Sequence, residues 1–260
     1  MTKKVLTILL TTLLFLSAVT LGCANVFRVD NVAMVATVVS EGSKEGVAQL
    51  KEELLSIYKN RSIFSVKQKE VEDILEQYPY FRIAEFKKVY PNEVVVTIEE
   101  EAEVYAVEKS EGEYYILGVT GAVLEVRSSW KNRLDNEDNV LIKGLSVEGE
   151  KGGLLSGDDC WQTMFLLCET MNECLGGIRS NVLSVEVISR APETFFVIKM
   201  REGVKVYIGA PSVMTVEKAQ SAMNKYMVLS DAERMTGRLT VRDNDGEVFV
   251  SYSSEDEFEY

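Results

Sequence analysis

The sequence predicts an α+β protein: an N-terminal transmembrane helix, a small strand–helix–helix–strand–strand domain, then a mixed or antiparallel β domain with two helices. Three observations support this prediction. Residues 5–27 form a long apolar run, residues 28–101 contain two helical spacings between apolar strands, and residues 102–252 contain many short apolar strands separated by turn residues.

The N-terminal run contains no charged residue from Val5 to Phe27 and follows Lys3 and Lys4. As a helix it would span about 34 Å, enough for a hydrocarbon core of about 30 Å. The two lysines predict a cytoplasmic N-terminus and an exported remainder. The apolar residues expected to form this membrane anchor are Val5, Leu6, Ile8, Leu9, Leu10, Leu13, Leu14, Phe15, Leu16, Val19 and Leu21.

A processed N-terminus is the alternative to a retained anchor. Small residues precede Cys23, as at a lipoprotein processing site, but Thr20 holds the place where such sites usually have leucine. The apolar run also continues to Phe27, beyond the usual length of a signal core. We favour the retained anchor, and an exported lipoprotein or ligand- or protein-binding module anchored through Cys23 stays open.

The small domain is expected to begin with a strand over residues 32–39 and to end with an alternating strand over 93–100. Ser43 and Ser65 are expected to cap its two helices, and Tyr78-Pro79 to end the second. The apolar residues predicted on the buried faces of the two helices are Val47, Leu50, Leu54 and Ile57, then Val71, Ile74 and Leu75.

This order, together with Ser62-Ile63-Phe64 between the helices, Tyr78-Pro79-Tyr80-Phe81 with Ala84, and the run from Val89-Tyr90-Pro91-Asn92 to Glu100, resembles a polypeptide-transport-associated (POTRA) domain of the FtsQ/DivIB cell-division family. The family usually follows its final glutamate with Arg and, two residues on, Pro. Glu101 and Glu103 occupy those places here.

The second domain continues the resemblance, which covers residues 3 to 252. Gly121-Ala122-Val123-Leu124 and Leu141–Leu145 match family elements, and Asp245-Gly246 is expected to turn a terminal hairpin. Strands are expected at 104–107, 114–117, 122–126, 182–188, 195–200, 204–208 and within 239–252, with helices at 161–175 and 214–232. The predicted division is a cytoplasmic tail 1–4, anchor 5–27, POTRA domain 28–101, β domain 102–252 and acidic disordered tail 253–260.

Composition excludes several functions. The chain has 28 basic and 41 acidic residues, a net charge of −13, and no histidine. Proteins bind the phosphates of nucleic acid through clustered Lys and Arg, and a net negative charge repels them. We therefore expect no nucleic-acid partner. Without histidine, Ser-His-Asp and Cys-His catalytic pairs cannot form, and the commonest zinc ligand is missing.

The acidic and cysteine motifs are expected to have structural roles. Glu99–Glu101 with Glu103 are expected at a solvated strand end, although an exported hydrolase using carboxylates is a third hypothesis. In Asp243–Gly246 a calcium loop would need carboxylates at positions where Val241 and Tyr252 stand. On their predicted helix Cys160, Cys168 and Cys174 are too far apart for a disulfide, so we expect buried apolar roles. We predict no enzyme activity, no cofactor and no metal site.

The resemblance implies a membrane scaffold of the bacterial divisome at the plasma membrane and division septum, supporting septum formation and septal cell-wall synthesis. In this family the last strand, with the Arg that ends the preceding strand, binds a partner of the FtsB/DivIC type, and an FtsL-like protein and other divisome components join the assembly. Carried onto this sequence, the partner-binding residues are Arg242, Gly246, Val248, Phe249, Val250 and Tyr252. The alternation does not say which of these side chains point outward.

Overall fold

The structure is a computed structural model that describes residues 3–36, 43–133, 137–190 and 193–255. The chain divides into two compact units, Met1–Glu101 (the first unit) and Ala102–Tyr260 (the second unit). Each is considered by itself. Residues 256–260 of the predicted acidic tail lie outside the described residues, whereas Ser253, the first residue of that predicted tail, belongs to the last strand.

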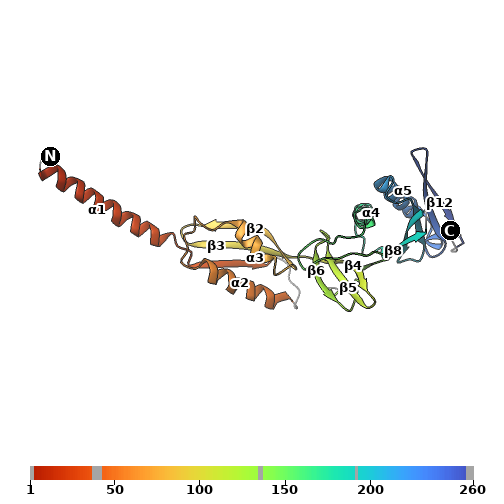
Figure 1. The fold of residues 1–260 in the computed structure, drawn as a ribbon, viewed down its shortest axis with the longest axis horizontal. Helices are drawn as coiled ribbons and strands as arrows, with labels where there is room; N and C mark the ends of the chain where they lie inside the picture. Colours follow the sequence, from red (N-terminus) through yellow and green to blue (C-terminus); the bar gives the residue numbers. More distant parts are fainter. Residues whose placement is uncertain (1–2, 37–42, 134–136, 191–192, 256–260) are drawn as a thin grey trace. The chain divides into compact units, whose positions relative to one another are not determined.

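The first element is helix α1, Lys3–Val26, in the place where the sequence predicts an anchor helix (Figure 1). In the described part of the chain, no helix combines the length and apolar character needed to cross a membrane. The side chains of five predicted anchor residues lie outside the described part, namely Val5, Leu6, Ile8, Val19 and Leu21. Membrane anchoring therefore stays a prediction.

The rest of the first unit is a three-stranded sheet with two helices, in the predicted order (Figure 1). Its elements are β1 Asn31–Ala36, α2 Lys44–Tyr58, α3 Gln68–Leu75, β2 Phe81–Val89 and β3 Glu93–Glu100. The sheet order is β1-β3-β2, with β1 parallel and β2 antiparallel to β3. As the alternation predicts, Val94, Val96 and Ile98 on β3 are fully buried. They share one core with Leu50 and Leu54 of α2.

The helix starts differ from the sequence prediction. Ser43 precedes α2, but its hydroxyl donates to the Glu100 carboxylate and makes no cap bond. The second helix begins at Gln68, because the Ser65 hydroxyl donates to the carbonyl of Ser62 and holds a turn instead. On α2, Ile57, which the spacing predicts on the buried face, is 38% exposed, and Tyr58 is buried in its place.

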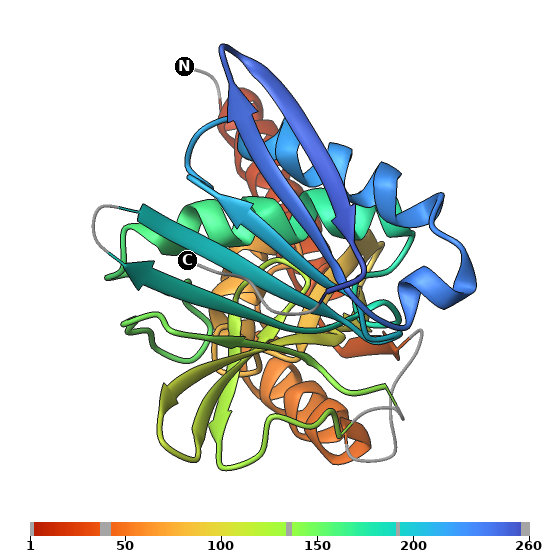
Figure 2. The same cartoon turned by 90° about the vertical axis from the view of Figure 1, so that its right-hand side faces the viewer.

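The second unit is one nine-stranded mixed sheet of order β12-β11-β10-β9-β8-β7-β4-β5-β6 (Figure 2). Its strands are β4 Glu103–Ser110, β5 Glu113–Gly118, β6 Val123–Arg127, β7 Val140–Lys143, β8 Val182–Arg190, β9 Glu193–Met200, β10 Lys205–Gly209, β11 Arg238–Asn244 and β12 Glu247–Ser253. β7 is parallel to both β4 and β8, β10 is parallel to β11, and the remaining pairs are antiparallel.

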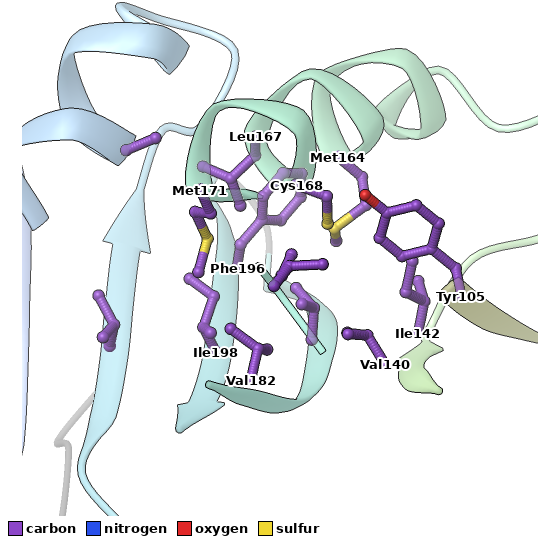
Figure 3. Packing of buried hydrophobic residues seen from close by; sticks show 14 of the residues in the cluster. Tyr105, Val140, Ile142, Met164, Leu167, Cys168, Met171, Val182, Phe196 and Ile198 are labelled. Atoms are coloured by element: carbon purple, nitrogen blue, oxygen red, sulfur yellow. The ribbon is translucent and has the colours of Figure 1, made fainter. Parts of the chain in front are cut away.

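Helices α4, Cys160–Leu175, and α5, Thr215–Met227, cover the same face of this sheet (Figure 2). Figure 3 shows Met164, Leu167, Cys168 and Met171 of α4 directed at the strands. Burial raises the pKa of the Cys168 thiol to about 12, as its predicted apolar role requires, whereas the other two cysteines on α4 are half-buried. The core of the second unit lies between these helices and the sheet.

The single helix predicted over residues 214–232 is wrong. α5 ends at Met227, and a separate short helix, α6, covers Asp231–Arg234. The break follows from local capping: Ser230 has an extended backbone, and its hydroxyl and backbone N–H both bond the Glu233 carboxylate. This capping box starts a new helix instead of continuing the old one.

The expected solvated strand end at Glu99–Glu103 is also wrong in part. Glu101 is 6% exposed and Glu103 is 0% exposed. The Arg127 guanidinium binds the Glu103 carboxylate through two bonds, Nη1–Oε1 at 3.0 Å and Nη2–Oε2 at 2.6 Å. Asn139 Nδ2 adds a third bond at 3.2 Å, and Arg133 Nε lies 3.6 Å away. A buried carboxylate is tolerated here because its oxygens have charged and amide donors.

A second buried charge attaches α5 to the sheet. Lys218 is fully buried, and its ammonium donates to the carbonyls of Gly209 and Ala210, each at 2.8 Å. It also pairs with the Asp243 carboxylate on β11. The hydrogen bond from Lys218 holds the pKa of Asp243 below its usual range.

We predict that Glu103→Ala lowers the free energy of unfolding of the second unit by about 2–4 kcal/mol, because Arg127 and the buried Asn139 lose the carboxylate that both bond, while Glu125 still pairs with Arg127. Both tryptophans, Trp130 and Trp161, lie in this unit, so their fluorescence in a urea titration follows its unfolding. The exposed Glu111→Ala is the control and should change stability by no more than about 0.5 kcal/mol. Equal midpoints for both variants would contradict a role of Glu103 in stability.

We also predict that the Lys218–Asp243 pair makes stability depend on acid pH. The folded-state pKa of Asp243 is lowered, so the stabilisation is present above the unfolded value of about 3.9 and is lost as the pH falls through the folded-state pKa. The wild-type protein should therefore be more stable than Asp243→Asn at neutral pH, and the difference should shrink below about pH 4. Urea midpoints over a pH series measure this; a difference independent of pH would refute it.

Candidate protein-binding site

The predicted binding residues lie on the hairpin formed by β11 and β12. Its connection is Asp245-Gly246, with φ of 50° and 84°. Two successive positive φ values are the requirement of a type I′ turn, the connection that matches the twist of paired strands. The predicted hairpin turn is confirmed, and Gly246 lies at its tip.

β12 forms one edge of the nine-stranded sheet, and β6 forms the other. At the β6 edge the chain itself pairs with the first residue of the strand: the Val123 N–H donates to the Gly153 carbonyl, and the Gly152 N–H donates to the Val123 carbonyl, both at 2.8 Å. Ala122 also makes an isolated bridge to Leu154. In the part of the chain that the structure describes, no further strand pairs with β12 beyond β11.

Side chains of β12 alternate between the two faces of the sheet. Val248, Val250 and Tyr252 are half-buried against the core beneath α5, whereas Phe249 is 53% exposed on the opposite face. Arg242 stands directly across from Phe249 in the register and is also exposed. The structure therefore splits the six predicted residues into an inward set, Val248, Val250 and Tyr252, an outward pair, Arg242 and Phe249, and the turn residue Gly246.

The sequence prediction missed two residues of the outward face. Thr240 and Ser251 pair across β11 and β12, two positions from Arg242 and Phe249, so they share the face of that pair. Strict alternation would have found them, but Phe249 between Val248 and Val250 makes the strand read as continuously apolar.

A cavity of about 620 Å³ includes Arg242 in its lining. The start of α4, the start of β9 and the connection after β10 form its other walls. Three carboxylates also line it, those of Asp159, Glu193 and Asp243. Asp243 has a lowered pKa, the reverse of what a general acid at neutral pH needs.

The glutamates that the hydrolase hypothesis would use are bonded to structural partners. Glu99 bonds Arg82 at 2.9 Å, Glu100 accepts from Ser43, and Glu103 is occupied by Arg127. Each carboxylate therefore has its own structural partner. Among the described residues, no group of three His, Cys, Asp or Glu side chains is arranged to hold a metal ion. The hairpin offers the backbone groups at the edge of β12, the ring of Phe249 and the guanidinium of Arg242. These groups suit recognition of another polypeptide.

In a comparison with known protein families, residues 49–101 match the POTRA domain, FtsQ-type. The matched segment begins within α2 and includes α3, β2 and β3. Comparison with curated proteins finds no match. An FtsQ-type POTRA domain indicates a cell-division scaffold, in a family that is generally not enzymatic and that works through protein–protein interactions.

The order of elements in the first unit and this domain match agree with each other and with the resemblance carried by the sequence. Residues 49–101 therefore match the FtsQ-type POTRA domain that the sequence resemblance implies for this part of the chain.

Proposed function

We propose that this protein is a non-enzymatic, single-pass membrane scaffold of the divisome that captures an FtsB/DivIC-like partner by adding a strand to β12. The observation that supports this most is the position of β12 at the edge of the sheet. β12 has β11 as its neighbour on one side and no described strand on the other, whereas at the β6 edge the chain itself bonds Val123. Such an edge offers backbone N–H and C=O groups to an incoming strand.

The outward side chains supply specificity to this edge. Arg242 is exposed and would pair with a carboxylate on the partner, where its planar guanidinium allows two parallel bonds. Phe249, opposite it, provides an exposed ring of the kind that anchors protein interfaces. Val248, Val250 and Tyr252 act differently from this pair: they hold β12 on the core and so fix the edge in place.

The N-terminal segment would place this edge at the division site. We propose that Val5–Phe27 is retained as the anchor, with the N-terminus in the cytoplasm and both units outside, because Lys3 and Lys4 precede the apolar run. An FtsL-like protein would join the same assembly, and through these partners the scaffold would support septum formation and septal cell-wall synthesis.

Phe249→Pro is expected to abolish capture of an FtsB/DivIC-like partner, because proline adds no backbone donor and disrupts a strand edge. Co-purification from membranes measures capture, and tryptophan fluorescence checks that the second unit stays folded. Glu255→Pro, two residues beyond β12, is the matched control and should bind normally. Phe249→Ala keeps the backbone and removes the ring, so its loss of affinity should be partial. Unchanged co-purification of a folded Phe249→Pro variant would refute strand addition at β12.

Intact mass of the protein extracted from membranes tests the anchor. The expected mass is that of a chain that retains residues 1–27. A chain beginning at Cys23 and carrying the added mass of lipid would instead support the lipoprotein alternative.

A further inference from the structure

Three aromatic side chains gather where the chain leaves α1. The ring centroids of Phe27 and Phe64 are 5.3 Å apart, those of Phe64 and Tyr90 are 5.5 Å apart, and those of Phe27 and Tyr90 are 6.3 Å apart. Phe64 is 59% exposed and Tyr90 is 56% exposed, so the group, here called the aromatic cluster, presents apolar surface outside the core of the first unit.

The aromatic cluster is fixed to the end of α1 without a linker. The helix ends at Val26, and Phe27 follows it directly. The Phe27 carbonyl accepts from the Ile63 N–H at 2.9 Å, and Arg28 bridges to Ser62. The next residue, Val29, donates its N–H to the Arg61 carbonyl at 2.8 Å and is fully buried. The segment that carries Phe64 is thus hydrogen-bonded to the first residues after the helix.

These contacts set the depth of the cluster relative to the membrane. If α1 crosses the bilayer, Phe27 lies at the end of the apolar segment, at the boundary between hydrocarbon and headgroups. Phe64 and Tyr90 contact Phe27 directly, so they lie at the same boundary whatever direction the helix takes from the domain. Aromatic rings are favoured at this depth, where tyrosine keeps its hydroxyl in the polar layer.

Three basic residues lie on the segments that form or adjoin the cluster, although the chain as a whole carries a charge of −13. Lys88 Nζ lies 3.5 Å from the Phe64 carbonyl, and Arg28, next to Phe27, is exposed. Lys59 is exposed beside Asn60, whose N–H donates to Val29. Cations beside exposed rings complement anionic phospholipid headgroups, which attract each nearby Lys or Arg.

We propose that the aromatic cluster of Phe27, Phe64 and Tyr90, with its neighbouring Arg28, Lys59 and Lys88, is a lipid-docking surface that seats the first unit on the outer leaflet of the membrane. This proposal rests on the anchor of the proposed function. It adds a second contact with the same bilayer, made by side chains of the folded domain. The domain is then held at the membrane and is not free to swing on the end of its helix.

The test uses the full chain reconstituted into vesicles of phosphatidylcholine and phosphatidylglycerol, with bromine on the acyl chains near the headgroup as a fluorescence quencher. Phe64→Trp adds a reporter to the cluster, and its emission, after subtraction of the parent protein, should be blue-shifted and strongly quenched. Val35→Trp is the matched control on β1: Val35 is 48% exposed, and it lies about 13 Å further along the strand than Asn31. Its quenching should be several-fold weaker.

Flotation of the same vesicles separates the two proposals. A chain that floats, with Trp at position 64 no more quenched than Trp at position 35, would overturn lipid docking and leave the anchor intact. A chain that does not float would overturn the anchor and the docking with it. Quenching at position 64 should also fall in vesicles of phosphatidylcholine alone and in the Arg28→Gln/Lys59→Gln variant. Protection of position 64 only after a partner protein is added would show that a protein, and not lipid, covers the cluster.

Discussion

Backbone hydrogen bonding is the constraint on which the second unit depends. Every strand inside a sheet satisfies its N–H and C=O groups through two neighbours, and the two edge strands each have one side left over. Here the loop containing Gly152 and Gly153 folds back on the start of β6 and bonds both backbone groups of Val123. The helices cover one face of the sheet, which leaves β12 and the opposite face as the surface available for recognition.

Buried charges hold the less regular parts of this unit in place. Glu103, at the start of β4, accepts from Arg127 at the end of β6 and from Asn139 just before β7. Lys218 connects α5 to β11 and to the end of β10. In both cases a charge far from solvent is compensated by several hydrogen bonds, the condition under which burial of an ion is tolerated. The Lys218–Asp243 pair lies beside Arg242, so the same contact that secures α5 also orients the strand that carries the outward face.

In the first unit, the folded domain begins within a few residues of the end of the apolar helix α1. Backbone bonds from Phe27 and Val29 to residues 61–63 start the domain immediately after α1. The helix–helix connection and the turn between β2 and β3 both come to this end of the unit, where they contribute Phe64 and Tyr90. Two connections far apart in sequence therefore share one exposed surface.

Periodicity and turn chemistry determined much of the fold from the sequence alone. The alternation of Val94, Val96 and Ile98 and the Asp245-Gly246 turn are local patterns, and both have the predicted structure. The sequence also carried the family resemblance. Tertiary structure decided what depends on distant partners: Glu103 is buried because Arg127 and Asn139 reach it, and Ser43 turns to Glu100 instead of capping its helix. Tertiary structure also decided that Phe249 points outward while its neighbours on β12 pack on the core. Strand pairing and the helices that cover the sheet determine which side chains face the core, and the apolar character of the residues alone does not.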